Sequence, residues 1–226
     1  MKTSAAEPRE PERFVPALGF ERLTALYDPV VRLTTREARF KRRLLDQASL
    51  RSGQRVLDLA CGTGTLAVSA KVRAPGAHVQ GLDGDPAVLR RARAKAYAVG
   101  VEVEFREGRS EHLPYADGSF DVVLSTLFFH HLSREAKERS TREIARVLVP
   151  GGSLHVADWG PPGDPLMRLL FTGVRALDGF EPTRDNATGA LPAIFRSAGL
   201  ESGEESGRLR TMFGSLAFYA SRRPRE

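Results

Sequence analysis

A turn with two glycines follows a carboxylate in the stretch VLDLACGTGTLA, residues 56–67. Asp58 lies in an apolar run typical of a strand, and Gly62 and Gly64 precede a helical pattern in the spacing of a dinucleotide fingerprint. Such a turn offers backbone N–H groups and the positive end of a helix to a ligand. The carboxylate of Asp58 would repel a diphosphate but attract an ammonium group. The pattern therefore favours a ligand with a cationic end over a dinucleotide.

A second carboxylate, Asp83, ends the next apolar run, at the distance of about 20 residues that suits a ribose-binding acidic residue. A carboxylate can accept hydrogen bonds from both ribose hydroxyls at once. This spacing fits a nicotinamide cofactor as well as any other adenosine-bearing cofactor. S-Adenosylmethionine (SAM) combines a ribose with a sulfonium and an ammonium group, so it would satisfy both Asp58 and Asp83.

Acid–base chemistry would need other side chains, and the sequence offers His130, His131 and Asp158 at the ends of two further apolar runs. A histidine oriented by an aspartate can deprotonate a hydroxyl. The alternative is that these histidines only support the fold. No cluster of His, Cys and acidic residues at ligand spacing accompanies them, so no metal site is predicted. Cys61 is expected to be a small buried residue and not a nucleophile.

The elements that hold these residues follow from alternating strand-like and helix-like patterns. We expect strands at 55–59, 78–83, 101–107, 121–125 and 154–158, and helices at 65–73, 86–99 and 133–149. Asp85 or Asp83 and Ser133 are suitable N-caps, and Gly100 is a suitable helix end. This alternation predicts an α/β protein with a Rossmann-like, doubly wound sheet that is mostly parallel and has helices on both faces.

The two ends of the chain differ from this central pattern. Residues 1–13 read as a disordered tail, and 14–226 as a single domain that begins with a helical cap at 14–50, broken by YDP at 27–29. Residues 161–190 read as an inserted lid over the substrate, with helices at 166–180 and 189–199. Two strands around Gly214 would complete a seven-stranded sheet with an antiparallel strand near the C-terminus.

Composition narrows the choice of partners. The net charge of +6 comes from basic residues spread over helical stretches without interleaved aromatics, so no nucleic-acid partner is predicted. No apolar run reaches the roughly 20 residues that span a bilayer, and the start lacks the apolar segment of a signal peptide. With one cysteine in addition, the expected location is cytoplasmic. A peripheral membrane contact stays open, and the oligomeric state is not predicted.

Four motifs then point to one family: VLDLACGTG, GLDGDP, LPYADGSFDVVLS and RVLVPGGSLHVADWG. In order and spacing they resemble the motifs of class I SAM-dependent methyltransferases. The resemblance covers roughly residues 20 to 222 and is strongest to the branch with the ubiquinone and menaquinone biosynthesis enzymes. It implies that the glycine turn holds the methionyl part of SAM and that the chain transfers a methyl group, with S-adenosylhomocysteine as product.

The resemblance also implies which residues hold the cofactor. Asp58, Ala60, Gly62 and Gly64 would line its amino-acid end, Asp83 with Gly84 and Asp85 its ribose, Ser110 and Glu111 its adenine, Ser125 or Thr126 its sulfonium, and Tyr27 would close over it. Two positions depart from the family pattern. Ala60 replaces the commoner first glycine, and Arg109 stands where relatives usually carry an aspartate, so the adenine edge would be held by Glu111 or by backbone groups alone.

The acceptor is expected to be a small apolar or aromatic molecule methylated at O, C or N by in-line displacement. The reason is the apolar content of 166–180, although these side chains could also simply pack the helix onto the sheet. Catalysis would rest on alignment and exclusion of water, with a base only where the acceptor loses a proton. The alternatives are a quinone- or lipid-pathway methyltransferase at the membrane surface, an NAD(P)-dependent reductase, and a SAM-binding protein without turnover.

Overall fold

The computed structural model describes residues 37–225, apart from the side chain of Ser202. The predicted tail at 1–13, most of the predicted helical cap and Tyr27 lie outside these residues. A seven-stranded sheet has the order β3-β2-β1-β4-β5-β7-β6. Its strands are β1 (Arg55–Leu59), β2 (His78–Asp83), β3 (Glu104–Glu107), β4 (Phe120–Thr126), β5 (Leu148–Trp159), β6 (Glu201–Thr211) and β7 (Gly214–Arg222).

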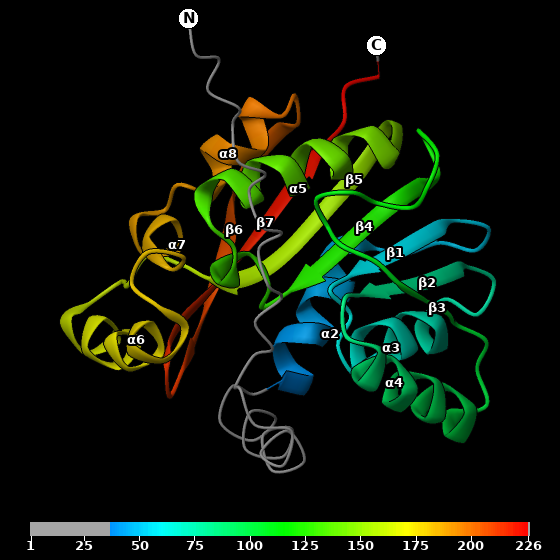
Figure 1. Cartoon of the computed structure of the whole chain (residues 1–226), viewed down its shortest axis with the longest axis horizontal. Coiled ribbons are helices and arrows are strands. Elements are labelled where there is room, and N and C mark those ends of the chain that lie inside the picture. The colour runs from blue at the N-terminus through cyan, green and yellow to red at the C-terminus, as the bar shows by residue number, and fades with distance from the viewer. Residues whose placement is uncertain (1–36, 226) are drawn as a thin grey trace, which may run out of the picture.

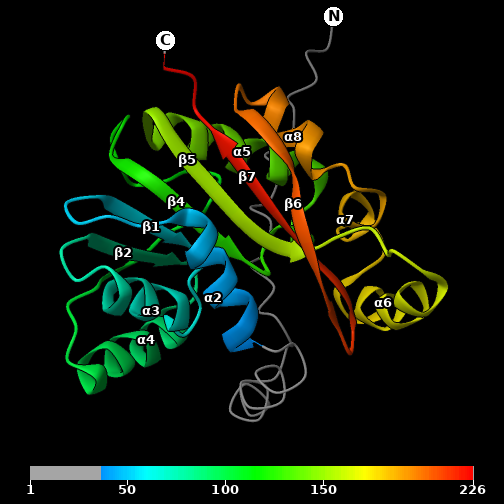
Figure 2. The same cartoon turned by 180° about the vertical axis from the view of Figure 1, so that it is seen from behind.

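Helices cover both faces of this sheet (Figures 1 and 2). They are α2 (Glu37–Ala48), α3 (Thr65–Arg73), α4 (Pro86–Val99), α5 (Arg134–Val147), α6 (Pro165–Asp178), α7 (Arg184–Thr188) and α8 (Leu191–Ser197), with a short 3-10 helix η1 (Phe129–His131). Strands β1 to β5 run parallel, and β7 lies antiparallel to both β5 and β6. The predicted fold class is confirmed.

The strand order reverses between β1 and β4, and this reversal fixes where a ligand can bind. From β1 the chain proceeds to β2 and β3 on one side, then returns to β4 on the other. In open α/β sheets the crevice at such a switch point, at the carboxyl ends of the strands, is the ligand site. Leu59 pairs with Ser125, and Thr126 pairs with Ala157, so the ends of β1, β4 and β5 lie side by side.

Helix α4 has the predicted ends, and its C-terminus explains why β3 starts late. Asp85 caps the helix by accepting a hydrogen bond from the backbone N of Ala87 at 2.7 Å. Gly100 has a left-handed backbone, with φ of 75°, and the N–H of Val101 still bonds to the carbonyl of Ala96 at 3.1 Å. The predicted strand at 101–107 is therefore too long, because its first residue belongs to the helix cap.

Strand β5 is longer than the predicted 154–158. Leu148 already pairs with Phe120, and the register shifts before Ser153 pairs with Val122. The intervening Pro–Gly–Gly segment forms an irregularity within the strand, which a scan for continuous apolar runs reads as a break. The preceding helix α5 ends at Val147, two residues before the predicted end, and begins at the predicted Ser133 cap.

Two apolar layers hold the sheet between its helices. Val56 of β1 packs with Phe40 and Leu44 of α2 and with residues of α3 and α4. Leu57 and Leu59, which point to the opposite face because side chains alternate along a strand, pack with residues of α5 and α8. Burying one such side chain contributes about 1.5–3 kcal/mol, so both layers are needed to offset the entropy of ordering the chain.

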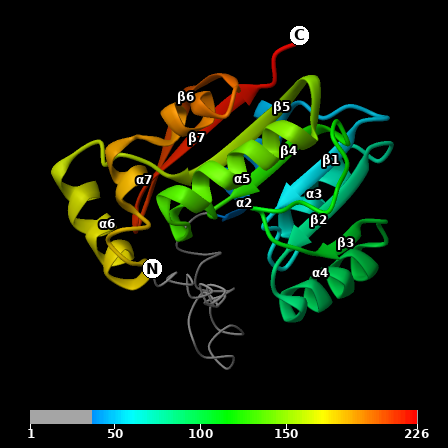
Figure 3. The same cartoon turned by 45° about the horizontal axis from the view of Figure 1, so that its top comes forward.

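Helices α6 and α7 follow β5 and lie at one end of the molecule, beside the tip of the β6–β7 hairpin (Figures 1 and 3). They occupy the segment for which a lid was predicted, and the predicted helices at 166–180 and 189–199 correspond to α6 and α8. Helix α7 was not predicted. Within residues 37–225, no helix has the length and apolarity that crossing a bilayer requires.

Candidate active site

The glycine turn after β1 is built from residues in the left-handed region of backbone space. Ala60, Gly62 and Gly64 have φ of 56°, 53° and 73°. A Cβ at Gly64 would lie 2.8 Å from Cβ of Ala92 and 2.9 Å from the ring of Phe105, so this glycine allows α3, α4 and β3 to pack closely. A Cβ at Gly62 would meet nothing within 4 Å. Gly62 therefore leaves open space where a ligand can approach the backbone.

Asp83 fixes this turn against the end of β2. Its Oδ2 accepts a hydrogen bond from the N–H of Gly62 at 2.8 Å, and its Oδ1 accepts one from the N–H of Asp85 at 3.0 Å. Burial raises the pKa of Asp83 against the lowering effect of these N–H groups. The carboxylate is half-buried, and each oxygen retains lone-pair capacity for a further donor.

Lys95 of α4 holds the other side of the turn. Its Nζ donates hydrogen bonds to Oγ1 of Thr63 at 3.0 Å and to Oγ1 of Thr65 at 2.6 Å. This lysine was not predicted as a site residue, although it lies on the helix that the turn faces. Asp83 and Lys95 thus hold the turn by hydrogen bonds from two sides.

Asp58 is the unusual group of the site. It is 1% exposed, and neither oxygen of its carboxylate has a hydrogen-bond partner among the described residues. Burial raises its pKa to about 7, although the positive charge of Lys41 on α2 acts in the opposite direction. Asp58 points to the same sheet face as Val56, two residues earlier, and therefore lies under α2. The backbone N–H of Ala67 also lowers the pKa of Asp58, but no side chain of the described residues donates to the carboxylate, so a cationic group would bind here favourably.

The residues expected near adenine and sulfonium already have protein partners. Ser110 Oγ lies 2.7 Å from Ser140 Oγ, and Glu111 accepts hydrogen bonds from Ser110 Oγ at 3.1 Å and Arg109 Nη2 at 3.0 Å. Burial opposes ionisation of Glu111, but its own backbone N–H and Arg109 hold its pKa below the usual range. Ser125 is fully buried and donates a hydrogen bond to the carbonyl of Leu59 at 3.1 Å.

A histidine–aspartate pair lies at the ends of β4 and β5. Nδ1 of His130 lies 2.7 Å from Oδ1 of Asp158, and both side chains are buried. Asp158 also accepts hydrogen bonds from the backbone N–H groups of Phe128, Phe129 and Trp159 at 3.0, 2.7 and 2.7 Å. These contacts position η1, and with it both histidines, directly above the carboxyl edge of the sheet.

The protonation state of this pair follows from its surroundings. Burial alone would raise the pKa of Asp158, but His130 and the N–H group of Trp159 outweigh it and hold the pKa below the usual range. An ionised Asp158 accepts, so Nδ1 of His130 is the donor, and Nε2 is the nitrogen left for another partner. That nitrogen faces Asp178 of α6, whose Oδ2 lies 3.6 Å away. The hydrogen bond to Asp158 thus orients the ring so that Nε2 is the nitrogen that can exchange a proton with a neighbouring group.

Asp178 was not predicted as a site residue. It follows Phe171 and Val174 on the buried side of α6, and a carboxylate on an otherwise apolar helix face was the available sequence signal. Its Oδ1 lies 3.9 Å from Nδ1 of His131, which is more exposed than His130, with 33% of its side chain accessible. One ligand atom each from His130, His131 and Asp178 lies within 4.8 Å of the others.

This grouping of His130, His131 and Asp178 was not predicted from the sequence. The fold brings Asp178 of α6 to the two histidines from a distant part of the chain. The expectation that no cluster at ligand spacing accompanies the two histidines concerned positions along the chain, whereas in space Asp178 lies close to both of them. The absence of a bound metal stays a prediction.

Aromatic side chains border the histidines. The ring centroids of Trp159 and His130 are 6.3 Å apart, and those of Trp159 and Phe171 are 5.7 Å apart. Asn186 of α7 donates hydrogen bonds to the carbonyl of Trp159 at 2.9 Å and to Asp158 at 3.3 Å. Helices α6 and α7 thus contact the same end of β5 that holds the histidine–aspartate pair.

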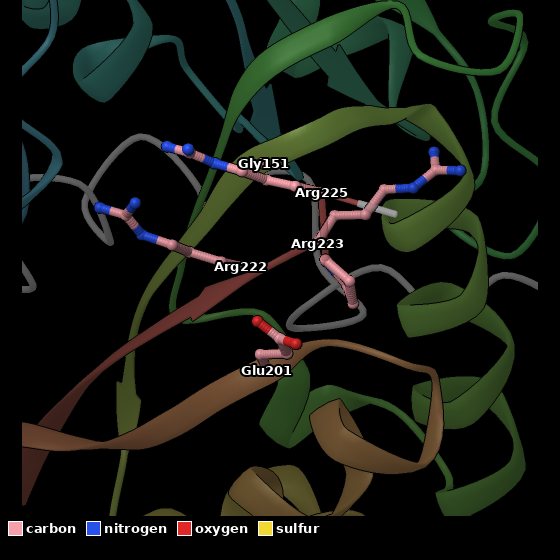
Figure 4. A pocket seen from close by; sticks show the side chains of 6 residues that line it. Gly151, Glu201, Arg222, Arg223 and Arg225 are labelled. Atoms are coloured by element: carbon pink, nitrogen blue, oxygen red, sulfur yellow. The ribbon is translucent and has the colours of Figure 1, made fainter.

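A hollow of about 590 Å³ lies at the opposite end of the sheet, where β5 begins and β7 ends. It is lined by Gly151, Glu201, Pro224 and three arginines, Arg222, Arg223 and Arg225. The side chains of Arg222 and Arg225 point away from that of Arg223 (Figure 4). Because the guanidinium groups do not converge and the carboxyl ends of the parallel strands lie at the other end of the sheet, this hollow is not the candidate active site.

Comparison with known proteins decides the family. A family model described as a methyltransferase domain matches residues 56–152. The demethylmenaquinone methyltransferase of Thermus thermophilus is 43% identical over 154 residues, which cover 67% of this chain and 69% of that protein. The chain belongs to the class I SAM-dependent methyltransferases. This methyltransferase is also 36% identical over 135 residues to the ubiquinone/menaquinone biosynthesis C-methyltransferase of Ectopseudomonas mendocina, covering 58% of this chain and 52% of that protein.

Solved structures show the same fold for the methyltransferase. A SAM-dependent methyltransferase from Aquifex aeolicus superimposes with a TM-score of 0.66 at 20% identity, covering 93% of this chain and 99% of the other. A chain from the complex of Trm112 with a methyltransferase of Haloferax volcanii has a TM-score of 0.70 at 21% identity, covering 91% and 98%. At these identities the likeness concerns the fold alone.

The sequence left open whether the cofactor is a dinucleotide or SAM, and family membership decides between them. The cofactor of this methyltransferase is SAM. The residues present fit it, because the buried carboxylate of Asp58 has no side-chain donor among the described residues and Gly62 leaves open space beside the turn. Within the class I SAM-dependent methyltransferases, the chain belongs to the predicted branch, which contains the ubiquinone and menaquinone biosynthesis enzymes.

Proposed function

We propose that this methyltransferase methylates a small apolar or aromatic acceptor that loses a proton in the reaction. The observation that carries the proposal is the hydrogen bond of 2.7 Å between His130 and the buried Asp158. It leaves Nε2 of His130 as a base at the carboxyl edge of the sheet, next to Trp159. Acceptors of this kind include phenols and ring carbons activated by a hydroxyl group.

For the cofactor, we propose that Asp58 binds the ammonium group and Asp83 the ribose hydroxyls. Gly62, Gly64 and Ala60 would contact the ligand through their backbone, with Gly84 and Asp85 beside the ribose. Because Glu111, Ser110 and Ser125 are held by protein partners, their part is to shape the adenine and sulfonium regions, and backbone groups would hold the adenine edge. Tyr27 keeps its proposed role as a residue that closes over the cofactor.

In this mechanism the protein aligns two reactants and removes one proton. SAM, when bound, supplies a methyl group on a sulfonium that leaves as a neutral thioether. As the acceptor's O or C forms its bond to the methyl carbon, Nε2 of His130 takes the proton that the acceptor releases. Asp158 holds His130 in the correct tautomer and stabilises the imidazolium that results. Trp159 and Phe171 exclude water from the reacting atoms.

Two measurements test the proposal. Calorimetry should show binding of SAM and S-adenosylhomocysteine at about micromolar to tens of micromolar concentrations, weakened by Asp83→Ala. A methyl-transfer assay over phenols, hydroxylated quinones and amines should give product with acceptors that lose a proton, and His130→Gln should reduce kcat by about 10²–10⁴-fold. An unchanged kcat in His130→Gln would refute the base, and turnover of amines alone would refute the acceptor class.

A second candidate acceptor is a lipid-soluble quinone precursor. The specific observation in its favour is the 43% identity to an enzyme named demethylmenaquinone methyltransferase. Methylation of a hydroxylated quinone ring carbon requires a base, as the first proposal does, so the two share one mechanism. Comparing a water-soluble naphthol with a prenylated demethylquinone, at matched concentrations in detergent, separates them by their kcat/KM values.

Domain organisation and location belong to the same proposal. We propose that residues 14–226 act as one domain in which 161–190 covers the acceptor, supported by the contacts of Phe171 and Asp178 with the site. We propose a small-molecule acceptor in the cytoplasm, and no nucleic acid, on the composition described above. Inhibition of methyl transfer by added RNA or DNA would contradict the proposal that the protein has no nucleic-acid partner.

A further inference from the structure

His130, His131 and Asp178 form a group of potential metal ligands at the carboxyl edge of the sheet. The carboxylate of Asp178 presents one oxygen to each ring. Its Oδ2 lies 3.6 Å from Nε2 of His130, and its Oδ1 lies 3.9 Å from Nδ1 of His131. Both separations are too long for hydrogen bonds, so the three side chains face one another without a direct bond.

These separations are close to those between two ligands of one metal ion. Zinc binds imidazole nitrogen and carboxylate oxygen at about 2.0–2.2 Å, so two ligand atoms in a tetrahedral site lie about 3.4 Å apart. The separations of 3.6 and 3.9 Å are only slightly longer. An ion among the three side chains would therefore require only small side-chain movements.

The hydrogen bond between His130 and Asp158 already orients one of these ligands. Metal-binding histidines usually donate their second ring N–H to a carboxylate, which fixes the ring. Nδ1 of His130 lies 2.7 Å from Oδ1 of the buried Asp158, and three backbone N–H groups hold Asp158 in turn. Nε2 of His130 is thereby directed to Asp178, as the metal-bound nitrogen of such a pair would be.

The charges around the group favour a cation. Asp158 and Asp178 both border the histidines, and among residues 37–225 no lysine or arginine lies in ion-pair range of Asp178. Asp178 is also the last residue of α6, where the negative end of the helix dipole adds to its charge. An ion can reach the group, because 27% of the Asp178 side chain and 33% of the His131 side chain are exposed.

We propose that His130, His131 and Asp178 bind one divalent transition-metal ion of the zinc class. Two nitrogen ligands favour such an ion over magnesium or calcium, which prefer oxygen ligands. Three protein ligands leave a fourth position for water or another small ligand. No metal site was predicted from the sequence, because Asp178 and the histidines are far apart along the chain, and the fold reverses that prediction.

Metal binding would have a consequence for the proposed reaction. The ion would occupy Nε2 of His130, the same nitrogen that is proposed to take the acceptor's proton. A metal-bound nitrogen has no lone pair for a proton, so the ion would inhibit methyl transfer reversibly. This consequence rests on the proposed function, whereas metal binding itself does not.

Titration of the full chain with Co²⁺ tests the binding. The protein, purified without a histidine tag and freed of metal with a chelator, should bind one Co²⁺ per chain. It should then develop the strong visible absorption of four-coordinate Co²⁺. One equivalent of Zn²⁺ should abolish this absorption by displacing Co²⁺, whereas the same concentration of Mg²⁺ should leave it unchanged.

Paired variants locate the site. His131→Gln/Asp178→Asn removes two ligands at nearly constant volume and should weaken Co²⁺ binding at least about 100-fold. The single variant Asp178→Asn, a smaller change, should weaken it at least about tenfold. The matched control, His78→Gln/Asp117→Asn, makes the same changes at an exposed histidine and an exposed aspartate elsewhere. It should bind Co²⁺ within about twofold of the wild type. Calorimetric SAM affinity should be unchanged in all three variants, which shows that each is folded.

The transfer assay tests the consequence. Zn²⁺ should inhibit the wild type and the control variant, and EDTA should restore their activity. The remaining activity of Asp178→Asn should need at least about tenfold more Zn²⁺ for half-inhibition. If no acceptor is turned over, the proposed function fails, but the Co²⁺ spectrum still decides the metal site.

A wild-type spectrum no stronger than that of hydrated Co²⁺ would overturn the metal site. Equal Co²⁺ affinity in the control and the His131→Gln/Asp178→Asn variants would overturn it as well, since the ion would then bind elsewhere. Displacement of Co²⁺ by Mg²⁺ as readily as by Zn²⁺ would contradict the nitrogen ligands. Stimulation of methyl transfer by Zn²⁺ would refute the inhibition.

Discussion

At the scale of single residues, Asp58 is a buried carboxylate whose pKa of about 7 places its ionisation near neutral pH. A cationic ammonium group binds the ionised form, so SAM binding should release a proton in the range below this pKa. SAM affinity is therefore expected to fall by up to about tenfold per pH unit below about pH 7 and to level off above it. Calorimetry between about pH 5.5 and about pH 7.5, in buffers of different ionisation enthalpy, measures both the affinity and the proton release.

The control for this prediction is Asp58→Asn, which has the same size but no charge to titrate. It should bind SAM more weakly at pH 7 and show a flat pH profile over the same range. If the wild-type profile is flat, or if the variant retains the slope, then Asp58 is not the group that binds the ammonium.

Asp158 combines a catalytic and a structural part, and substitutions can separate them. Asp158→Ala leaves three N–H groups and His130 without their buried acceptor, so the free energy of unfolding should fall by about 3–5 kcal/mol. Urea unfolding measures this loss. Asp158→Asn should fold better but hold His130 in the wrong tautomer, so kcat should fall far more than stability. Glu138→Ala, which removes an exposed ion pair with Arg134, should cost only about 0–1 kcal/mol.

At the scale of elements, local patterns predicted those parts of the fold that local interactions determine. Strands β1 and β2 and helices α3 and α4 have the predicted bounds, because apolar runs and cap residues such as Asp85 and Gly100 define them within a few positions. Strands β3 and β5 begin at other residues than predicted. A helix cap delays the start of β3, and an irregular pairing extends β5 toward its N-terminus; both depend on backbone hydrogen bonds that composition does not reveal.

The candidate site likewise contains residues that a local pattern predicts and residues that only the tertiary fold brings together. The turn residues follow from a contiguous motif, so Asp58, Gly62 and Gly64 were predicted together. Asp178 reaches His130 only because α6 folds back along the end of β5, and no local pattern contains that contact. Lys41 lowers the pKa of Asp58 because α2 packs over β1, and this too is a tertiary contact that no local pattern contains.

The glycine turn offers a prediction at the scale of one element. Gly64→Ala should destabilise the protein most, because its Cβ would lie 2.8 Å from Ala92 as well as being strained at φ 73°. Gly62→Ala has open space, so strain should cost only about 1–2 kcal/mol, but the new methyl group should weaken SAM binding. Thermal unfolding and calorimetry, run on the same samples, distinguish these two effects.

Gly100→Ala is the matched control, since φ is 75° and a Cβ would again meet nothing within 4 Å. It should lose a similar amount of stability to Gly62→Ala while SAM affinity stays unchanged, because Gly100 ends α4 away from the turn. Equal SAM affinity in the Gly62 and Gly100 variants would show that the ligand does not approach the turn at Gly62.

At the scale of the whole molecule, the sheet and the 161–190 segment are joined by a few buried polar contacts. Lys137 of α5 is fully buried and donates to the carbonyls of Leu132 and Pro182 at 2.9 and 2.5 Å. Its Nζ also lies 3.3 Å from Oδ2 of Asp185 at the start of α7. Burial lowers the pKa of Lys137 against the raising effect of Asp185. This lysine therefore links the helix beneath η1 to the segment proposed to cover the acceptor.

Lys137→Met keeps the length of the side chain but removes its donors, so the segment should open more often while the sheet stays intact. Amide hydrogen exchange should accelerate in α6 and α7 and remain unchanged in β1 and β2. SAM affinity should stay within about twofold, because the glycine turn does not contact this link, whereas KM for the acceptor should rise several-fold. Faster exchange throughout the sheet would mean that Lys137 supports global stability alone, and unchanged exchange in α6 and α7 would mean that other contacts hold the segment. Exchange confined to α6 and α7, with a raised acceptor KM, is the pattern expected of a cover that moves independently of the cofactor site.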